Sequence, residues 1–120
     1  MRKNTEQLIE AAIKGLQDKK AVDIVTIDLS KIENTFCNYF IICHGTSNTH
    51  VGGLADSAID TIIEECSEKP FHKEGLNNAQ WILLDYSDVI VHIFQKEYRD
   101  YYQLESMWSD AKIMHIEETV

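Results

Sequence analysis

The stretch AQWILLDYSDVIVHIFQ, residues 79–95, contains two apolar runs that are separated by the polar turn DYSD. Each run has the length and the β-branched and aromatic content of a strand, so the stretch predicts an antiparallel β-hairpin. Side chains alternate between the faces of a strand, which places Ile82 and Leu84 together on the face that we expect to cover the core. Trp81 and Asp85 then lie together on the other face. A tryptophan beside a carboxylate at the surface is typical of a site that meets a partner.

Apolar periodicity predicts helices and strands on both sides of this hairpin. The predicted elements, in chain order, are a helix with its apolar stripe at 8–16, strands at 22–29 and 38–44, a helix at 51–66, an edge strand at 71–73, hairpin strands at 80–85 and 89–94, and a helix at 97–107. This order is typical of an α/β protein: one domain over residues 1–120, with a mixed β-sheet flanked by helices. We expect its core to span about residues 5–112 and the C-terminal tail at 113–120 to be loose.

Gly52 and Gly53 lie inside the predicted helix at 51–66. Each glycine costs about 1 kcal/mol of helix stability against alanine. Glycines kept in a helix often mark the close approach of another backbone, so this pair is a candidate for such a contact.

Composition and charge exclude several classes of protein. The 120 residues carry 11 basic and 20 acidic side chains, a net charge of −9, which argues against a protein that coats bare nucleic acid and favours a basic partner. Cys37, Cys43 and Cys66 are odd in number and follow no CxxC spacing, so we expect reduced thiols in a cytoplasmic protein. The N-terminal sequence has no apolar signal-peptide region, and no apolar run approaches the ~20 residues of a membrane span.

The five histidines give no sign of a metal site. None forms an HxH or HxxxH pair, whereas tight zinc sites need three or four convergent ligands. We therefore expect no metal and no cofactor. His92 differs from the other histidines because the strand pattern places it on one face with Ile90 and Phe94. That pattern favours a half-buried structural histidine over a polar point on an interaction surface.

The turn Gly45-Thr46-Ser47 lies between a predicted strand and a predicted helix, where free N–H groups and the helix dipole can bind phosphate. This layout resembles that of nucleotidyltransferases, which hold magnesium with two carboxylates at D-x-D spacing on a following strand. The stretch that follows here, FHKEGLNNAQWILLDYSD, has no such pair, because Asp85 and Asp88 are three positions apart across a turn. Capping of the helix by Thr46 or Ser47 is a sufficient reason for these residue types. We therefore expect no enzymatic activity.

Aromatic and acidic residues gather toward the C-terminal end. The aromatic ones are Trp81, Tyr86, Tyr98, Tyr101, Tyr102 and Trp108, and the acids among or next to them are Asp85, Asp88, Glu97, Asp100, Glu105 and Asp110. Acids are seldom fully buried, so core packing alone does not explain this mixture. Tryptophan and tyrosine are common interface hot spots, and acids around them suit a basic partner.

Four stretches of the chain carry a family resemblance. They are DIVTIDLSK, NYFIICHGTSNTHVGGLAD, AQWILLDYSDVIVHIF and EYRDYYQLESMWSDAK, in order within residues 5–112. Together they resemble the ribosomal silencing factor family, also called Iojap-related proteins. The resemblance implies a non-enzymatic α/β protein with a nucleotidyltransferase-like sheet that lacks the catalytic carboxylates. It also implies a translational repressor that binds the large ribosomal subunit through ribosomal protein number fourteen and blocks its association with the small subunit, especially when nutrients are short.

The resemblance also assigns the partner-binding residues. Carried over by position, they are Trp81, Leu83, Asp85, Tyr86, Asp88 and His92 in the hairpin motif and Tyr101, Tyr102, Leu104, Glu105 and Trp108 in the closing motif. Asn38, Gln80 and Ser87 depart from the family pattern, which usually has an acid, a glutamate and a glycine there. Homodimers are common in the family. Two alternatives stay open, a nucleotide-binding enzyme that uses the Gly45-Thr46-Ser47 turn and an independent homodimeric scaffold.

Overall fold

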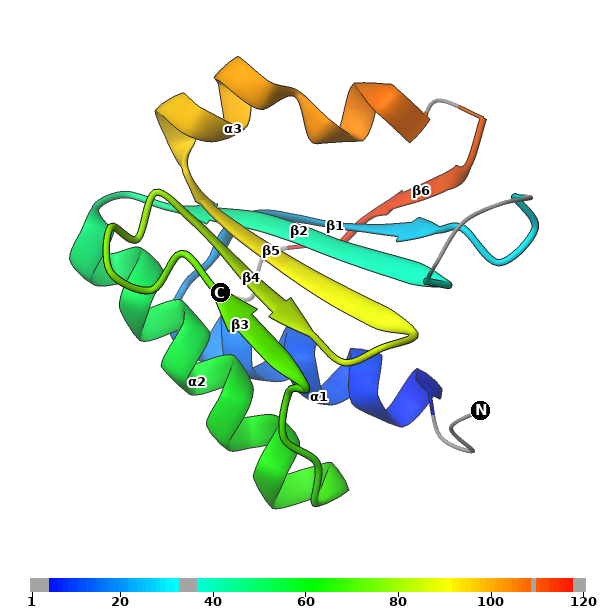
Figure 1. Cartoon of the computed structure of the whole chain (residues 1–120), viewed down its shortest axis with the longest axis horizontal. Helices are drawn as coiled ribbons and strands as arrows, with labels where there is room; N and C mark the ends of the chain where they lie inside the picture. The colour runs from blue at the N-terminus through cyan, green and yellow to red at the C-terminus, as the bar shows by residue number, and fades with distance from the viewer. Residues whose placement is uncertain (1–4, 33–36, 109, 118–120) are drawn as a thin grey trace.

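The chain folds into a six-stranded sheet with helices on both faces (Figure 1). The computed structural model describes residues 5–32, 37–108 and 110–117. In chain order the elements are α1 (Thr5–Asp18), β1 (Val22–Asp28), β2 (Tyr39–Gly45), α2 (Asn48–Cys66), β3 (His72–Glu74), β4 (Trp81–Asp85), β5 (Val89–Gln95), α3 (Lys96–Tyr102), the 3₁₀-helix η1 (Leu104–Trp108) and β6 (Lys112–His115). No helix among the described residues is both long enough and apolar enough to cross a membrane.

The strands lie in the order β3-β4-β5-β2-β1-β6, and only one neighbouring pair is parallel within this described sheet. That pair is β2 and β5 at the centre, while the remaining pairs are antiparallel. A parallel pair needs a crossover connection, and the segment from α2 to β4 supplies it. In Figure 1, α1 and α2 cover one face of the sheet, and α3 with η1 covers the other. Both central strands are apolar on both faces for this reason. The predicted mixed sheet flanked by helices is confirmed.

Two hydrophobic clusters occupy the two faces of the sheet. The larger one lies under α1 and α2 and includes Leu16, Leu54, Ile82 and Leu84, all of them fully buried. The smaller one lies under α3 and η1 and includes Phe40, Ile42, Ile90 and Phe94. The predicted core positions of Ile82 and Leu84 are confirmed, because β4 alternates between half-buried and buried residues along its length.

The two helices of the larger cluster approach each other closely at Gly15. A Cβ atom added to Gly15 would lie 2.7 Å from the carbonyl oxygen of Ser57, and the Ser57 hydroxyl donates a hydrogen bond to the Gly15 carbonyl at 2.7 Å. The expectation that Gly52 and Gly53 mark such a contact is wrong within the chain, since a Cβ at either position meets no atom within 4 Å. Their side of α2 is open.

The C-terminal end differs from the sequence expectation in two ways. The helix predicted at 97–107 is divided, because Gln103 adopts the left-handed conformation (φ 46°) and separates α3 from η1. Residues 112–115, where a loose tail was expected to begin, form β6, which pairs antiparallel with β1 from Val25 opposite His115 to Asp28 opposite Lys112. Residues 118–120 of that tail lie outside the described part of the chain.

Candidate partner-binding surface

Trp81 stands at the centre of an aromatic cluster formed by Trp81, His92, Phe94 and Tyr102. The antiparallel register places Trp81 opposite Phe94, and the two rings stack with centroids 4.9 Å apart and an interplanar angle of 25°. The ring of Tyr102, at the end of α3, lies 5.0 Å from the indole. The indole N–H donates a hydrogen bond to Nδ1 of His92 at 3.0 Å. Side chains from β5 and α3 therefore hold the half-buried tryptophan of β4 in place.

The aromatic cluster continues onto the outer surface of α3. Tyr101 is 80% exposed, and its ring meets that of Tyr102 edge to face at 5.1 Å, while Tyr102 is 48% exposed. Leu83, two positions along β4 from Trp81, is half-buried on the same face. This is an open surface of large side chains on a regular sheet and helix, with the residue types that carry most interface binding energy.

Asp85 and Asp88 lie at the other end of β4. A strand rises ~3.3 Å per residue, so the backbone of Asp85 is roughly 13 Å from that of Trp81. One oxygen of Asp85 accepts a hydrogen bond from the Ser87 N–H at 2.7 Å, and Oδ2 of Asp88 accepts one from the Thr5 hydroxyl at 2.6 Å. Both carboxylates thus stabilise the hairpin turn and its contact with α1. Ser87 adopts a φ of 78°, a conformation that glycine tolerates more easily.

Two of the residues that the family resemblance assigned to partner contact are buried inside the protein. Tyr86 is fully buried in the larger cluster, on the face of Ile82 and Leu84. His92 is only 4% exposed, so its ring contacts Trp81 and other neighbours inside the protein. A direct contact with a partner does not fit either residue. The expectation of a structural histidine fits the observed place of His92.

Leu104, Glu105 and Trp108 lie in η1 and are half-buried. Leu104 and Trp108 pack against the smaller cluster, and the Trp108 ring meets Phe40 edge to face at 5.9 Å. Glu105 faces Arg99, so its charge is already paired within the protein. These residues hold η1 on the sheet, which leaves only part of each side chain for a partner.

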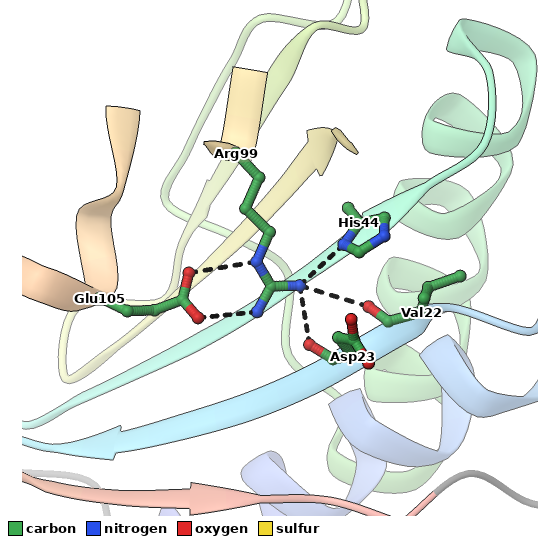
Figure 2. A network of polar contacts seen from close by, with 5 residues as sticks. All are labelled: Val22, Asp23, His44, Arg99 and Glu105. Atoms are coloured by element: carbon green, nitrogen blue, oxygen red, sulfur yellow. Dashed lines mark hydrogen bonds and ion pairs between the residues drawn. The ribbon is translucent and has the colours of Figure 1, made fainter. Parts of the chain in front are cut away.

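Arg99 is the residue of this region that the sequence analysis missed. It is 7% exposed and lies in α3, and its guanidinium reaches across to β1 and β2 (Figure 2). Nε and Nη2 donate to the two carboxylate oxygens of Glu105 at 3.1 and 2.9 Å. Nη1 donates to the Asp23 carbonyl at 2.8 Å and to Nδ1 of His44 at 2.9 Å, with a longer contact to the Val22 carbonyl. Burial, aided by the adjacent Arg99 charge, lowers the pKa of His44.

This network fixes α3 on the sheet, and α3 carries Tyr101 and Tyr102. A bidentate arginine–carboxylate pair is geometrically specific, and the carbonyl acceptors come from the irregular start of β1, where the β1–β2 register shifts. In the sequence, the only sign of this network was one arginine inside the acidic and aromatic segment EYRDYY. An arginine on a short helix is usually solvent-exposed, so that sign was weak.

The Gly45-Thr46-Ser47 turn uses its polar groups within the protein. The Ser47 hydroxyl accepts a hydrogen bond from the His50 N–H at 3.0 Å, which confirms the predicted helix cap. The Thr46 N–H donates to Nδ1 of His50 at 2.9 Å, and Nε2 of the same ring therefore donates to the Lys19 carbonyl at 2.7 Å. A phosphate group would have to displace the His50 ring to reach these donors. The described residues also contain no group of three or more His, Cys, Asp or Glu that could hold a metal ion.

Comparisons with known proteins give one consistent family. The model of the family described as ribosomal silencing factor during starvation matches residues 2–120. The chain is similar to ribosomal silencing factor RsfS of Bacillus subtilis, with 35% identity over 114 residues and 95% of each chain covered. The same named protein of Halalkalibacterium halodurans shares 32% identity over 117 residues, or 98% of each chain. A crystal structure of a Chromobacterium violaceum protein superposes with a TM-score of 0.81 and 30% identity, covering 95% of this chain and 94% of that one.

Proposed function

Because this chain belongs to the ribosomal silencing factor family, whose role is ribosome-associated silencing, we propose that it binds the large ribosomal subunit and sterically blocks association with the small subunit. Its contact on the ribosome is ribosomal protein number fourteen, and the repression acts especially when nutrients are short. The observation that carries the proposal is the family match over nearly the whole chain. Blocking by occupancy needs no turnover, so we expect no catalysis and no nucleotide or magnesium requirement.

We expect the aromatic cluster and the neighbouring Tyr101 to form the surface that contacts the ribosome, and their arrangement supports the proposal. Tyr101 and Tyr102 present large exposed areas, and Trp81 beside them is held in one orientation. Rigid aromatic side chains lose little conformational entropy on binding, which makes them effective hot spots. The net charge of −9 complements a basic ribosomal surface and speeds the encounter with it.

We also propose that the protein works in the cytoplasm, where ribosomes are free to exchange subunits, and that it forms a homodimer. A dimer that used the aromatic cluster would compete with the ribosome, whereas one that used another surface would not. Light scattering with and without Trp81→Ala separates these two cases, because only the first dimer would weaken.

The first test is co-sedimentation of the purified protein with separated ribosomal subunits. We expect binding to large subunits and none to small subunits, and addition of the protein before mixing should reduce the yield of joined ribosomes. Binding to small subunits alone would overturn the proposal. Titration with ATP, GTP and magnesium tests the enzyme alternative, for which we expect neither binding nor turnover.

The second test is Trp81→Ala, measured for large-subunit affinity and for stability side by side. We expect a loss of about 2–4 kcal/mol of binding, or roughly 30- to 1,000-fold in affinity. Trp81 is half-buried, so we also expect a loss of about 1–3 kcal/mol of folding stability, less than for a fully buried residue. The matched control is Ile63→Ala, which removes an exposed apolar side chain from α2 on the opposite face of the sheet. A lowered melting temperature with unchanged affinity per folded molecule would exclude Trp81 from the interface.

A further inference from the structure

We propose that His92 is a positioning residue that holds Trp81 in its binding orientation without touching the partner itself. This inference rests on the proposed function of Trp81. It deepens that function by separating the residue that contacts the partner from the residue that prepares the contact. Three observations carry it: the hydrogen bond between the two rings, the burial of His92, and the unpaired second nitrogen of its ring.

The hydrogen bond supplies a restraint that stacking does not. Phe94 stacks on the indole of Trp81 and fixes the plane of the ring, but a flip of roughly 180° about χ2 would keep that plane and exchange the two edges of the indole. The bond from the indole N–H to Nδ1 of His92 is directional, and at 3.0 Å it fixes which edge of the indole points toward the sheet. His92 lies opposite Leu83 in the register, one diagonal step from Trp81, so the two rings meet across the strands. The polar atom of the indole is turned inward, and the area offered to a partner is apolar.

Packing alone does not account for a histidine at this position. Nδ1 accepts the bond from Trp81, so the neutral ring carries its proton on Nε2, which is buried and has no hydrogen-bond partner among the described residues. A buried donor without a partner costs folding free energy. Burial lowers the pKa of His92 to about 3, so the ring stays neutral and Nδ1 remains an acceptor at physiological pH. A phenylalanine would pack beside Phe40, whose ring lies 4.6 Å away, without that cost.

The expected effect of losing the bond is a loss of preorganisation. An indole free to rotate must be ordered when the partner binds, which we expect to weaken the affinity by about 2- to 10-fold. Because the contacts in the complex are otherwise the same, most of the change should appear in a faster dissociation rate. A purely structural role would instead lower stability and leave the affinity of the folded molecules unchanged.

The experiment compares His92→Phe, His92→Asn and Trp81→Phe, with immobilised large ribosomal subunits as the binding probe. His92→Phe removes the unpaired Nε2–H but also leaves the indole N–H of Trp81 without its acceptor, so we expect these two effects to offset each other and the melting temperature to change little, whereas dissociation should be faster. His92→Asn places an amide oxygen close to the position of Nδ1, so it should retain more of the affinity than His92→Phe. In the Trp81→Phe background, which lacks the indole N–H, His92→Phe should have no further effect on affinity.

A measurement without the ribosome tests the positioning itself. In nitrogen-resolved NMR spectra, the indole N–H signal of Trp81 should shift and exchange faster with water in His92→Phe, while that of Trp108 should stay the same. An unchanged Trp81 signal would overturn the inference, as would wild-type dissociation by His92→Phe when Trp81→Ala binds weakly. If Trp81→Ala itself binds like the wild type, the proposed binding surface is wrong instead.

Discussion

At the scale of single residues, we expect His92 and His44 to make the free energy of unfolding depend on pH. Burial alone lowers the pKa of His92 from 6.5 to about 3, and burial with the nearby Arg99 charge lowers that of His44. Folding disfavours protonation of both rings, whereas the unfolded chain takes up protons below its ordinary histidine pKa. The contribution of His92 to stability is therefore fully present above about pH 6.5 and is lost as the pH decreases toward 3, and His44 acts in the same direction.

We expect His92 by itself to lower the free energy of unfolding by about 2 kcal/mol between about pH 7 and about pH 5. Urea unfolding at a series of pH values measures this loss. His92→Phe removes the titrating group, so its stability should decline less over the same interval, with the remaining slope due to other groups such as His44. Equal slopes for the two proteins would show that His92 is accessible to protons in the folded state. Asp28, whose pKa is lowered mainly by a hydrogen bond from the Ser30 side chain, adds a separate loss only in more acidic solution.

At the scale of elements, the glycines of α1 and α2 have opposite roles. Gly15 lets α1 approach the backbone of α2 near Ser57, so a side chain there would force the helices apart. Gly52 and Gly53 face open space, where glycine only weakens the helix. We expect Gly52→Ala to raise the free energy of unfolding by about 0.5–1 kcal/mol and Gly15→Ala to lower it by about 1–3 kcal/mol. Chemical unfolding of the two variants beside the wild type measures both changes, and a destabilised Gly52→Ala would contradict the open position.

At the scale of the whole molecule, the net charge of −9 should act on the rate of association with a basic partner. Glu97 is exposed on α3, one helical turn from Tyr101, and Glu64 is exposed on α2 on the opposite face. Glu97→Lys and Glu64→Lys both change the net charge from −9 to −7. We expect Glu97→Lys to slow association with large subunits more than Glu64→Lys does, with little change in dissociation.

The salt dependence gives a second measurement of the same effect. Wild-type association should slow between about 50 and about 300 mM salt because screening shortens the range of the charges. A flat response would indicate a contact without electrostatic steering. Asp88, which lies in the hairpin turn, is a poorer probe than Glu97, since its reversal would also break the hydrogen bond from Thr5.

Local sequence patterns were sufficient to predict much of the structure of this protein. Alternation along β4 placed Ile82 and Leu84 in the core and Trp81 on the opposite face, because side-chain direction in a strand is a property of the backbone. The hairpin and the Ser47 cap followed from residues within a few positions of each other. The mixed sheet followed from the order of the elements, and the family followed from four motifs that keep their order along the chain.

Only the tertiary structure decided the features that join distant segments. β6 is four residues long with little apolar pattern, and it is a strand because β1, some ninety positions earlier, offers a free edge. Arg99 is buried because the Asp23 carbonyl and Glu105 arrive from separate elements to satisfy its charge. His92 meets Trp81 through the register of β4 and β5. Sequence patterns report which side of an element faces the core, whereas these contacts depend on which partner the folded chain brings to that side.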